Sequence, residues 1–262
     1  MRPNGLRELW RQGGIALNAW LALGSAYAAE ILAHLSYDSI TIDLQHGMQD
    51  FETALTMLQA VSTASPVPMA RIPANQSWMV QRVLDAGAYG VICPMISDAQ
   101  QCSSFVGACR YPPSGERSFG PARGLLYGGR DYLQHANECI LTLAMIETPQ
   151  GLENIREILA VPELDGIYVG PSDLALSLGR PIVPHVHQDV RDAAAHLLRA
   201  SKSAGKRAGI FCPTLEFGQE MVRLGFDLVT VSNDAEILRN ASMTLLNTVR
   251  QPQGADHVAG SS

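Results

Sequence analysis

The chain has 262 residues, of which 47% are hydrophobic and 17% charged, and its formal net charge is -6. A chain of this length builds one large α/β barrel or two small domains, with a sizeable core. The negative balance lacks the basic surplus that nucleic-acid binding favours, so we expect no nucleic-acid partner.

The cysteines and the N-terminal segment indicate a cytoplasmic protein. The five cysteines are odd in number and form no C-x-x-C pair, so they predict neither a zinc site nor a disulfide framework, and a reducing compartment fits best. The Ala-Tyr-Ala sequence at 26–28 imitates a signal-peptide cleavage site, but Glu8 and Asn18 interrupt that pattern. No uninterrupted apolar run approaches the roughly 18 residues of a membrane span, so we expect no membrane partner.

Short β-branched or apolar runs recur along the chain, bounded by Gly, Pro or Asp and mostly separated by segments of helical period. This alternation is typical of repeated βα units around a parallel sheet. We predict eight strands, at Ile15–Leu23, Ser39–Leu44, Val67–Ile72, Gly90–Met95, Ile140–Ile146, Gly166–Val169, Arg207–Cys212 and Leu228–Ser232.

Two of the intervening helices have clear ends. "DFETALTMLQAVST" begins with Asp50 as the predicted N-cap, and "SWMVQRVLDAG" ends on Gly87 as the predicted C-cap. Eight strands with intervening helices, in a chain of this length, predict a closed (β/α)8 TIM barrel rather than an open doubly wound sheet. No composition shift marks a linker, so we expect a single domain over residues 1–250 and a disordered tail over residues 251–262.

The stretch from Ser97 to Glu138 is too long for one βα connection. Its middle, "YPPSGERSFGPARGLLYGG", is rich in Gly, Pro and Arg. We therefore predict an ordered loop that covers the barrel mouth.

Polar residues at the C-terminal ends of the strands are candidates for the chemistry, because the active sites of such barrels lie there. Glu147 and Asp173 follow adjacent predicted strands, and two carboxylates with few other protein ligands are typical of a hard divalent cation such as Mg²⁺ or Mn²⁺. The alternative is that both residues serve helix N-termini, in the first turn or as caps.

Further strand ends carry groups that do not belong in a core. Arg71 ends the third predicted strand, and its planar guanidinium suits a carboxylate or an enolate oxygen, with a surface ion pair as the alternative. His46 lies three residues after Asp43 and is a candidate proton carrier, with an ordinary loop histidine as the alternative. The turn "VGPSD" presents backbone N–H groups that can hold an anion such as a carboxylate.

Together these residues form a pattern that resembles the HpcH/HpaI aldolases, the metal-dependent class II pyruvate aldolases. The resemblance extends from about Trp20 to Asp234. Its most specific motifs are "IDLQHG", "ARI", "VICPM", "RYPPSGERSFG", "MIETPQGLENI" and "DGIYVGPSDLALSLG".

The resemblance implies a barrel of the phosphoenolpyruvate/pyruvate type whose last helix is swapped onto a neighbouring subunit, in a homo-oligomer that is usually a hexamer. It implies reversible cleavage of a 4-hydroxy-2-oxo acid to pyruvate and an aldehyde, through an enolate that a divalent metal, Mg²⁺, Mn²⁺ or Co²⁺, stabilises. The substrates are then small 2-oxo acids and aldehydes. The only two lysines, Lys202 and Lys206, precede the seventh predicted strand, away from the mouth, and this disfavours the Schiff-base class of aldolases.

The resemblance also implies roles for single residues. Glu147 and Asp173 match the metal ligands, and Arg71 matches the arginine that contacts the pyruvate or enolate oxygen. The turn that binds the pyruvate carboxylate matches Gly170, Pro171 and Ser172. Proline has no N–H, so the donors must be the amides of Ser172 and Asp173.

The proton-transfer residues follow in the same way. His46 matches the acid/base histidine, with Asp43 beside it. Asp85 matches a carboxylate that the family supplies to this histidine across a subunit interface.

Two positions depart from the best-known branch of the family, which has Glu in place of Gln45 and Gln in place of Met145. Both departures leave the metal carboxylates intact, so they bear on the aldehyde rather than on the reaction type. Phe211 matches a position that limits the acceptor pocket, and Trp20 and Gln45 are expected among the substrate-binding residues. The alternatives are an oxaloacetate decarboxylase or CoA-ester lyase on the same scaffold and, outside enzymes, a catalytically silent binding barrel.

Overall fold

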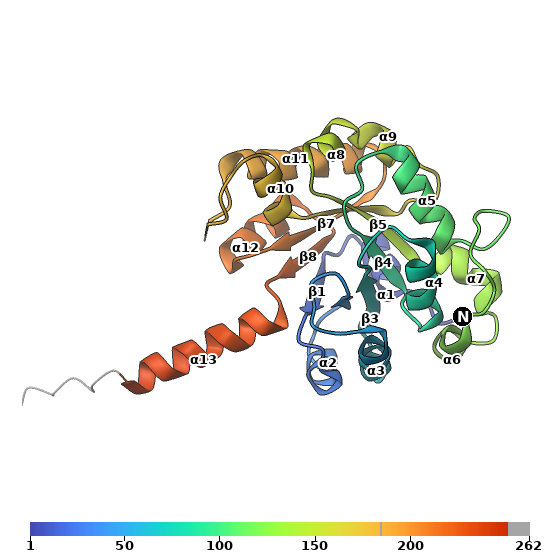
Figure 1. Cartoon of the computed structure of the whole chain (residues 1–262), viewed down its shortest axis with the longest axis horizontal. Helices are drawn as coiled ribbons and strands as arrows, with labels where there is room; N and C mark the ends of the chain where they lie inside the picture. Colours follow the sequence, from blue (N-terminus) through green and yellow to red (C-terminus); the bar gives the residue numbers. More distant parts are fainter. Residues whose placement is uncertain (184, 251–262) are drawn as a thin grey trace, which may run out of the picture.

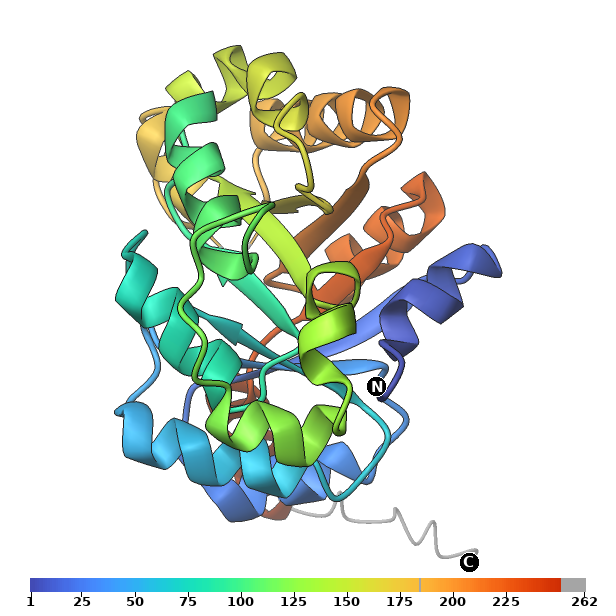
Figure 2. The same ribbon diagram turned by 90° about the vertical axis from the view of Figure 1, so that its right-hand side faces the viewer.

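Eight parallel strands close into one barrel in chain order, with β1 paired to β8. The computed structural model describes residues 1–183 and 185–250, and Figure 2 shows the strands at the centre of the surrounding helices. The predicted (β/α)8 barrel is confirmed, and every predicted strand agrees within two residues at each end. The strands are β1 (Ala16–Leu21), β2 (Ser39–Asp43), β3 (Val67–Arg71), β4 (Gly90–Cys93), β5 (Leu141–Ile146), β6 (Gly166–Val169), β7 (Arg207–Cys212) and β8 (Leu228–Val231).

Helices alternate with these strands, and some connections carry two or three helices. They are α1 (Gly5–Arg11), α2 (Ala26–Ala33), α3 (Phe51–Val61), α4 (Ser77–Asp85), α5 (Ala99–Cys109), α6 (Ala122–Gly128), α7 (Tyr132–Cys139), α8 (Pro149–Glu153), α9 (Ile155–Leu159), α10 (Pro171–Ser177), α11 (Gln188–Ser203), α12 (Leu215–Leu224) and α13 (Asp234–Arg250).

Burial explains why the apolar runs form strands. Every residue of β2, β3 and β5 is buried, because helices cover the outside of the barrel and side chains fill its inside. The inside also holds polar groups: Asn18 Nδ2 and the Tyr168 hydroxyl both donate to Thr230 Oγ1, at 2.9 and 2.7 Å. These bonds satisfy the buried polar groups of the barrel interior.

Both predicted helix ends are confirmed. The Asp50 carboxylate accepts a hydrogen bond from the Thr53 backbone N–H at 2.8 Å, which caps α3. Helix α4 ends at Asp85, and Gly87 follows with a φ of +101°, in the left-handed region that glycine adopts without strain.

The predicted position of the long connection at the barrel mouth is wrong. Arg110, directly after α5, donates to the carbonyls of Ile140 and Glu163 at 3.2 and 2.8 Å, and both of these residues precede strands. Arg123 of α6 donates to the carbonyl of Ala86, beyond the end of α4, at 2.7 Å. Because α5 runs antiparallel to β4, it carries the chain to the N-terminal ends of the strands before this connection begins.

Helix α13 projects away from the barrel (Figure 1). Of its residues, only Asp234 is buried, and its carboxylate accepts a hydrogen bond from the Ala22 backbone N–H at 2.7 Å. The helix exposes a series of large apolar side chains: Ile237, Leu238, Met243, Leu245, Leu246 and Val249.

Two sequence expectations concern the rest of the chain. The predicted disordered tail, residues 251–262, lies outside the described residues. Within residues 1–183 and 185–250, no helix combines the length and the apolar character that a membrane span requires.

Candidate active site

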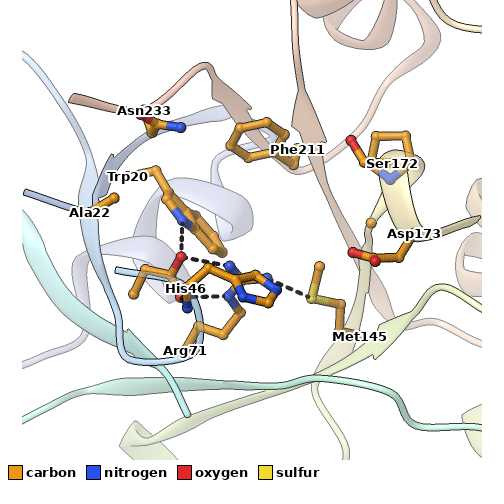
Figure 3. A pocket seen from close by; sticks show the side chains of 12 residues that line it. Trp20, Ala22, His46, Arg71, Met145, Ser172, Asp173, Phe211 and Asn233 are labelled. Atoms are coloured by element: carbon orange, nitrogen blue, oxygen red, sulfur yellow. Dashed lines mark hydrogen bonds and ion pairs between the residues drawn. The ribbon is translucent and has the colours of Figure 1, made fainter. Parts of the chain in front are cut away.

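A pocket of about 240 Å³ opens at the C-terminal ends of the strands. It is therefore at the end of the barrel where such folds carry their chemistry. Figure 3 shows His46, Arg71 and Trp20 on one side and Met145, Ser172 and Asp173 on the other. The lining consists of Trp20, Ala22, Asp43, His46, Arg71, Met145, Gly170, Pro171, Ser172, Asp173, Phe211 and Asn233.

Arg71 is held at the floor of this pocket by Asp43. Arg71 Nε donates to Asp43 Oδ1 at 2.8 Å and Nη2 donates to Oδ2 at 2.6 Å, and both side chains are buried. Trp20 adds a third donor, since its Nε1 lies 3.1 Å from Asp43 Oδ2. The surface ion pair considered for Arg71 is therefore a buried, two-point pair, which orients the guanidinium plane.

The third guanidinium nitrogen of Arg71, Nη1, makes no hydrogen bond to Asp43 and remains available to the pocket. Nη1 lies 4.0 Å from the Met145 sulfur, a weak acceptor. Burial by itself would raise the pKa of Asp43, but the hydrogen bonds and charge of Arg71, with the Trp20 and His46 donors, bring the pKa below its usual range. Asp43 thus stays ionised, and Nη1 is the guanidinium nitrogen that makes no hydrogen bond to Asp43.

Glu147 lies deep beneath the turn that begins α10. Its Oε1 accepts a hydrogen bond from the Met95 backbone N–H at 2.8 Å, while its Oε2 is buried and has no hydrogen-bond partner among the described residues. A Cβ placed on Gly170 would come within 2.4 Å of Oε2. Burial, with the negative charge of Asp173, raises the pKa of Glu147 to about 7.

Neither carboxylate caps a helix, although Asp173 stands in the first turn of α10, as the alternative interpretation allows. Thr148 caps α8 through its Oγ1, which accepts from the Gly151 N–H at 3.0 Å, and Gly170 occupies the N-cap position of α10. A buried carboxylate oxygen without a hydrogen-bond partner is costly unless another group binds it. A divalent cation that prefers oxygen ligands fits Glu147 and Asp173, with further positions open to water and substrate.

Of the two residues expected at the site after β2, His46 lines the pocket and Gln45 does not. His46 is exposed and lines the pocket, and the contact with Asp43 runs through its backbone N–H, 3.3 Å from Oδ1, rather than through the ring. Gln45 is half-buried and does not line the pocket, and its Oε1 lacks a hydrogen-bond partner in the described part of the chain. Of the residues that follow β2, His46 therefore lines the pocket, whereas Gln45 does not.

Aromatic side chains form an apolar part of the pocket lining. Trp20 stacks on Tyr168 with ring centroids 5.5 Å apart, and Phe211 meets Trp20 edge-on at 5.7 Å. Both Trp20 and Phe211 line the pocket, as predicted, while Tyr168 supports Trp20 from the barrel interior.

Asp85 is not part of this pocket. It ends α4, which runs back along the barrel from the mouth, and it pairs with Arg117 Nη2 at 2.8 Å. The Arg117 side chain is fully buried, whereas that of Asp85 keeps 28% of its surface exposed. Within one chain, Asp85 therefore does not reach His46.

Sequence reasoning missed two lining residues, Ala22 and Asn233. Asn233 directly follows β8 and caps α13, since its Oδ1 accepts from the Glu236 N–H at 2.9 Å. The signal in the sequence is a polar residue just after the eighth strand, the same signal that marks the other strand ends. Ala22 carries no chemical signal in the sequence.

We expect Glu147→Gln to raise the free energy of unfolding of the metal-free protein by on the order of 2 kcal/mol at pH 8, and by little at pH 5. Because the folded-state pKa is about 7 against an ordinary 4.5, the folded state binds the extra proton between these values. The stability of the metal-free parent therefore falls as the pH rises through this range. Urea unfolding with chelator measures it.

Exposed Glu153, on α8, supplies the control, since Glu153→Gln should leave stability unchanged at both pH values. An equal effect of Glu147→Gln at pH 5 and pH 8 would contradict the burial of a charged carboxylate as the cause.

Comparisons with known proteins agree with this site. Residues 17–241 match the family model described as HpcH/HpaI aldolase/citrate lyase. A hydroxypyruvate/pyruvate aldolase of Rhizorhabdus wittichii is 41% identical over 248 residues, which cover 94% of this chain and 99% of that protein. A 4-hydroxy-2-oxovalerate aldolase of Rhodococcus jostii is 34% identical, with 92% of this chain and 94% of that protein covered.

A solved structure extends the agreement to the fold. The crystal structure of an HpcH/HpaI aldolase/citrate lyase family protein from Burkholderia cenocepacia superimposes with a TM-score of 0.88 at 35% identity, covering 95% of this chain and 100% of that one. Since the matched region, residues 17–241, includes the pocket residues and all of the barrel strands except the first residue of β1, the chain belongs to the HpcH/HpaI aldolase/citrate lyase family.

Proposed function

We propose that the protein is a divalent-metal-dependent aldolase that reversibly cleaves a 4-hydroxy-2-oxo acid to pyruvate, or a related 2-oxo acid, and an aldehyde. Membership of the family, with aldolases among its relatives, makes the chain a carbon–carbon lyase of the pyruvate aldolase class. The main support for a bound metal is Glu147 Oε2. This oxygen is buried without a hydrogen-bond partner in the described structure, and it is close to Asp173 at the pocket.

Glu147 and Asp173 would hold the metal, and Mg²⁺ and Mn²⁺ suit two carboxylates best, with Co²⁺ as a further candidate. A bound divalent cation would stabilise the negative charge that develops on the keto oxygen as the C3–C4 bond breaks. The two ligands follow β5 and β6, which pair directly, so the barrel itself sets their separation.

The chain's own residues would bind and orient the substrate. The turn at Gly170, Pro171 and Ser172 lines the pocket at the start of α10, where the first backbone N–H groups of a helix have no partner within the helix. The amides of Ser172 and Asp173 are the donors for the substrate carboxylate. Arg71 Nη1, held in place by Asp43, is the donor for the keto oxygen of the same acid.

His46 is the residue that would move the proton of the substrate 4-hydroxyl, because it is exposed to the pocket and histidine exchanges protons near neutral pH. Trp20 and Phe211 would exclude water from the side of the pocket that receives the aldehyde. Asp85, held by Arg117, would act on the His46 of a neighbouring subunit, since it does not reach that of its own.

A swapped C-terminal helix would bring subunits together. Helix α13 exposes its apolar side chains and projects from the barrel, and α2 with the turn that follows it exposes Tyr27, Ile31 and Leu35. Such surfaces are covered in most stable proteins. We infer that α13 packs on a neighbouring barrel in a homo-oligomer, a hexamer on the family pattern, and light scattering of the full chain and of a chain ending before α13 measures this. A monomeric full chain would contradict it.

The cellular location proposed is the cytoplasm. All five cysteines are free thiols within the described residues, and four of them are buried. Free, buried thiols suit a reducing compartment.

Phe211→Ala should raise the ratio of kcat/KM for a bulky aldehyde acceptor over that for a small one by about tenfold, since a few methylene-sized contacts are worth about 1–3 kcal/mol. The Phe211 ring lies at the pocket edge against Trp20, so its removal widens the acceptor side alone. Initial rates of aldol addition with a series of aldehydes measure the ratio. An unchanged ratio would show that Phe211 does not limit acceptor size.

The function itself is tested by pyruvate release from a panel of 4-hydroxy-2-oxo acids, with oxaloacetate alongside. The protein is treated with chelator and assayed again after addition of Mg²⁺, Mn²⁺ or Co²⁺. Metal-restored cleavage of a hydroxy-oxo acid supports the aldolase. Reaction of oxaloacetate alone would indicate a decarboxylase, and no reaction with any member would contradict the proposed substrate class.

A further inference from the structure

The short loop between β4 and α5 contains an unusual backbone conformation. Met95 has a φ of 59°, in the left-handed region that residues other than glycine rarely adopt. Among the described residues, Ser232 and Glu163 are the only other such cases outside glycine. The conformation costs on the order of 1–2 kcal/mol, so it persists only where the surroundings enforce it.

Three hydrogen bonds tie this loop to the end of β5 and the helices that follow. The Ile96 N–H donates to the Met145 carbonyl at 3.1 Å, and the hydroxyls of Ser97 and Thr148 lie 2.9 Å apart. Asn154 Nδ2 donates to the Ser97 carbonyl at 2.9 Å. The loop is thus fixed to the segment that carries Glu147.

This backbone conformation allows the Met95 N–H to contact the Glu147 carboxylate. The Met95 N–H donates to Glu147 Oε1 at 2.8 Å, which leaves Oε2 as the carboxylate oxygen without a partner in the described structure. Oε2 also lies on the side of Gly170, because a Cβ there would approach it to 2.4 Å. The amide therefore decides which of the two oxygens is free and in which direction it points.

The Met95 side chain does not explain the conformation, since 51% of its surface is exposed. A residue selected for packing would be buried. The backbone, rather than the thioether, is the part in contact with the site.

We propose that Met95 is a positioning residue for metal binding: its left-handed backbone holds Glu147 Oε1 and presents Oε2 to the divalent cation. This inference rests on the proposed function, because it assumes the cation that Glu147 and Asp173 would hold. It differs from that proposal in concerning a residue that touches neither metal nor substrate. Such outer contacts typically change metal affinity by about 10–100-fold.

Calorimetric titration of the metal-free protein with Mn²⁺ tests the proposal in four variants: Met95→Gly, Met95→Asn, Met95→Ala and Met95→Ile. Glycine and asparagine tolerate the left-handed region, alanine less so, and a β-branched residue least. We expect Mn²⁺ affinity close to the parent for Met95→Gly and Met95→Asn, and at least about tenfold weaker for Met95→Ile, with Met95→Ala between.

Glu163 provides the matched control. Its φ is 58°, nearly that of Met95, but it lies before β6 at the end of the barrel opposite the pocket and is exposed. Glu163→Ile introduces the same backbone conflict and also removes the 3.1 Å ion pair between Glu163 Oε2 and Arg110. Both changes lie at the end of the barrel opposite the pocket, so Mn²⁺ affinity should be unchanged. If Met95→Ile does not fold, the comparison of Met95→Ala with Met95→Gly decides, with circular dichroism confirming that each is folded.

Three results would overturn the inference: equal affinity throughout the Met95 series, a loss in Met95→Gly as large as in Met95→Ile, or a similar loss in Glu163→Ile. In each of these the parent still binds Mn²⁺, so the proposed function survives. A parent chain that binds no divalent cation would overturn both.

Discussion

Glu147→Gln and Asp173→Asn are each expected to lower kcat/KM for metal-dependent cleavage by at least about 10³-fold while the barrel still folds. Each change removes one of the two proposed anionic ligands, and the stabilisation of transition-state charge by a metal is worth several kcal/mol, where each 1.4 kcal/mol is a factor of ten. Within the described residues the Glu147 carboxylate makes one hydrogen bond, which it accepts from the Met95 N–H, and a Gln oxygen can accept the same bond. Pyruvate release at saturating Mn²⁺, with unfolding measured in parallel, gives both quantities.

Asp189 supplies the matched control, since it too stands in the first turn of a helix, α11, and carries an exposed ion pair to Arg180. Asp189→Asn should change activity little, because exposed pairs contribute roughly 0–1 kcal/mol. Full activity of either site variant in the presence of chelator would eliminate the metal from the mechanism.

Arg71→Met is expected to lower the free energy of unfolding by about 3–5 kcal/mol and to remove most of the activity. The stability loss arises because Asp43 would remain buried with its charge unpaired, 2% exposed in the parent structure. The activity loss arises because Nη1 is the part of the guanidinium that faces the pocket. Arg71→Lys should recover little, since an ammonium cannot make both hydrogen bonds to the carboxylate and also face the substrate.

A double-mutant cycle with Asp43→Asn separates the two effects. In the double variant no buried charge is left alone, so its stability loss should be clearly smaller than the sum of the two single losses. Activity should stay low, because the guanidinium is still absent. Strict additivity of the stability losses would contradict a coupled pair, and Arg180→Met, which breaks an exposed pair, serves as the reference for a simple surface loss.

The barrel can be predicted from the sequence because its strands are buried. Strands such as β3 and β5 are covered on both faces, so they consist mostly of apolar residues, and Gly, Pro or a polar residue bounds each run. Because the active end of such a barrel is the C-terminal end of the strands, the first charged residues after β5 and β6, Glu147 and Asp173, could be predicted together with Arg71. The structure places Asp173 and Arg71 at one pocket and Glu147 beneath it.

The sequence does not predict in this way at which end of the barrel the long connection after α5 lies. Gly, Pro and Arg in residues 110–121 indicate a loop, but they do not indicate which end of the barrel the loop covers. That is decided by where α5 ends and by the carbonyls that Arg110 meets there, which come from segments more than twenty residues away. Likewise, the direction of Gln45 away from the pocket, and of His46 into it, depends on the turn that Asp43 Oδ1 imposes on their backbone.

The sequence by itself determined the order of the strands, the end of the barrel that reacts and the chemical types of the groups there, because these follow from local apolar runs and from what interrupts them. Only the tertiary structure decided the orientation of the polar groups at the strand ends. Met95 has no sequence signal for a left-handed backbone, and it adopts one because Ile96 and Ser97 are bonded to residues some fifty positions further along the chain. The free oxygen of Glu147 is therefore a product of contacts between segments, which local sequence patterns do not encode.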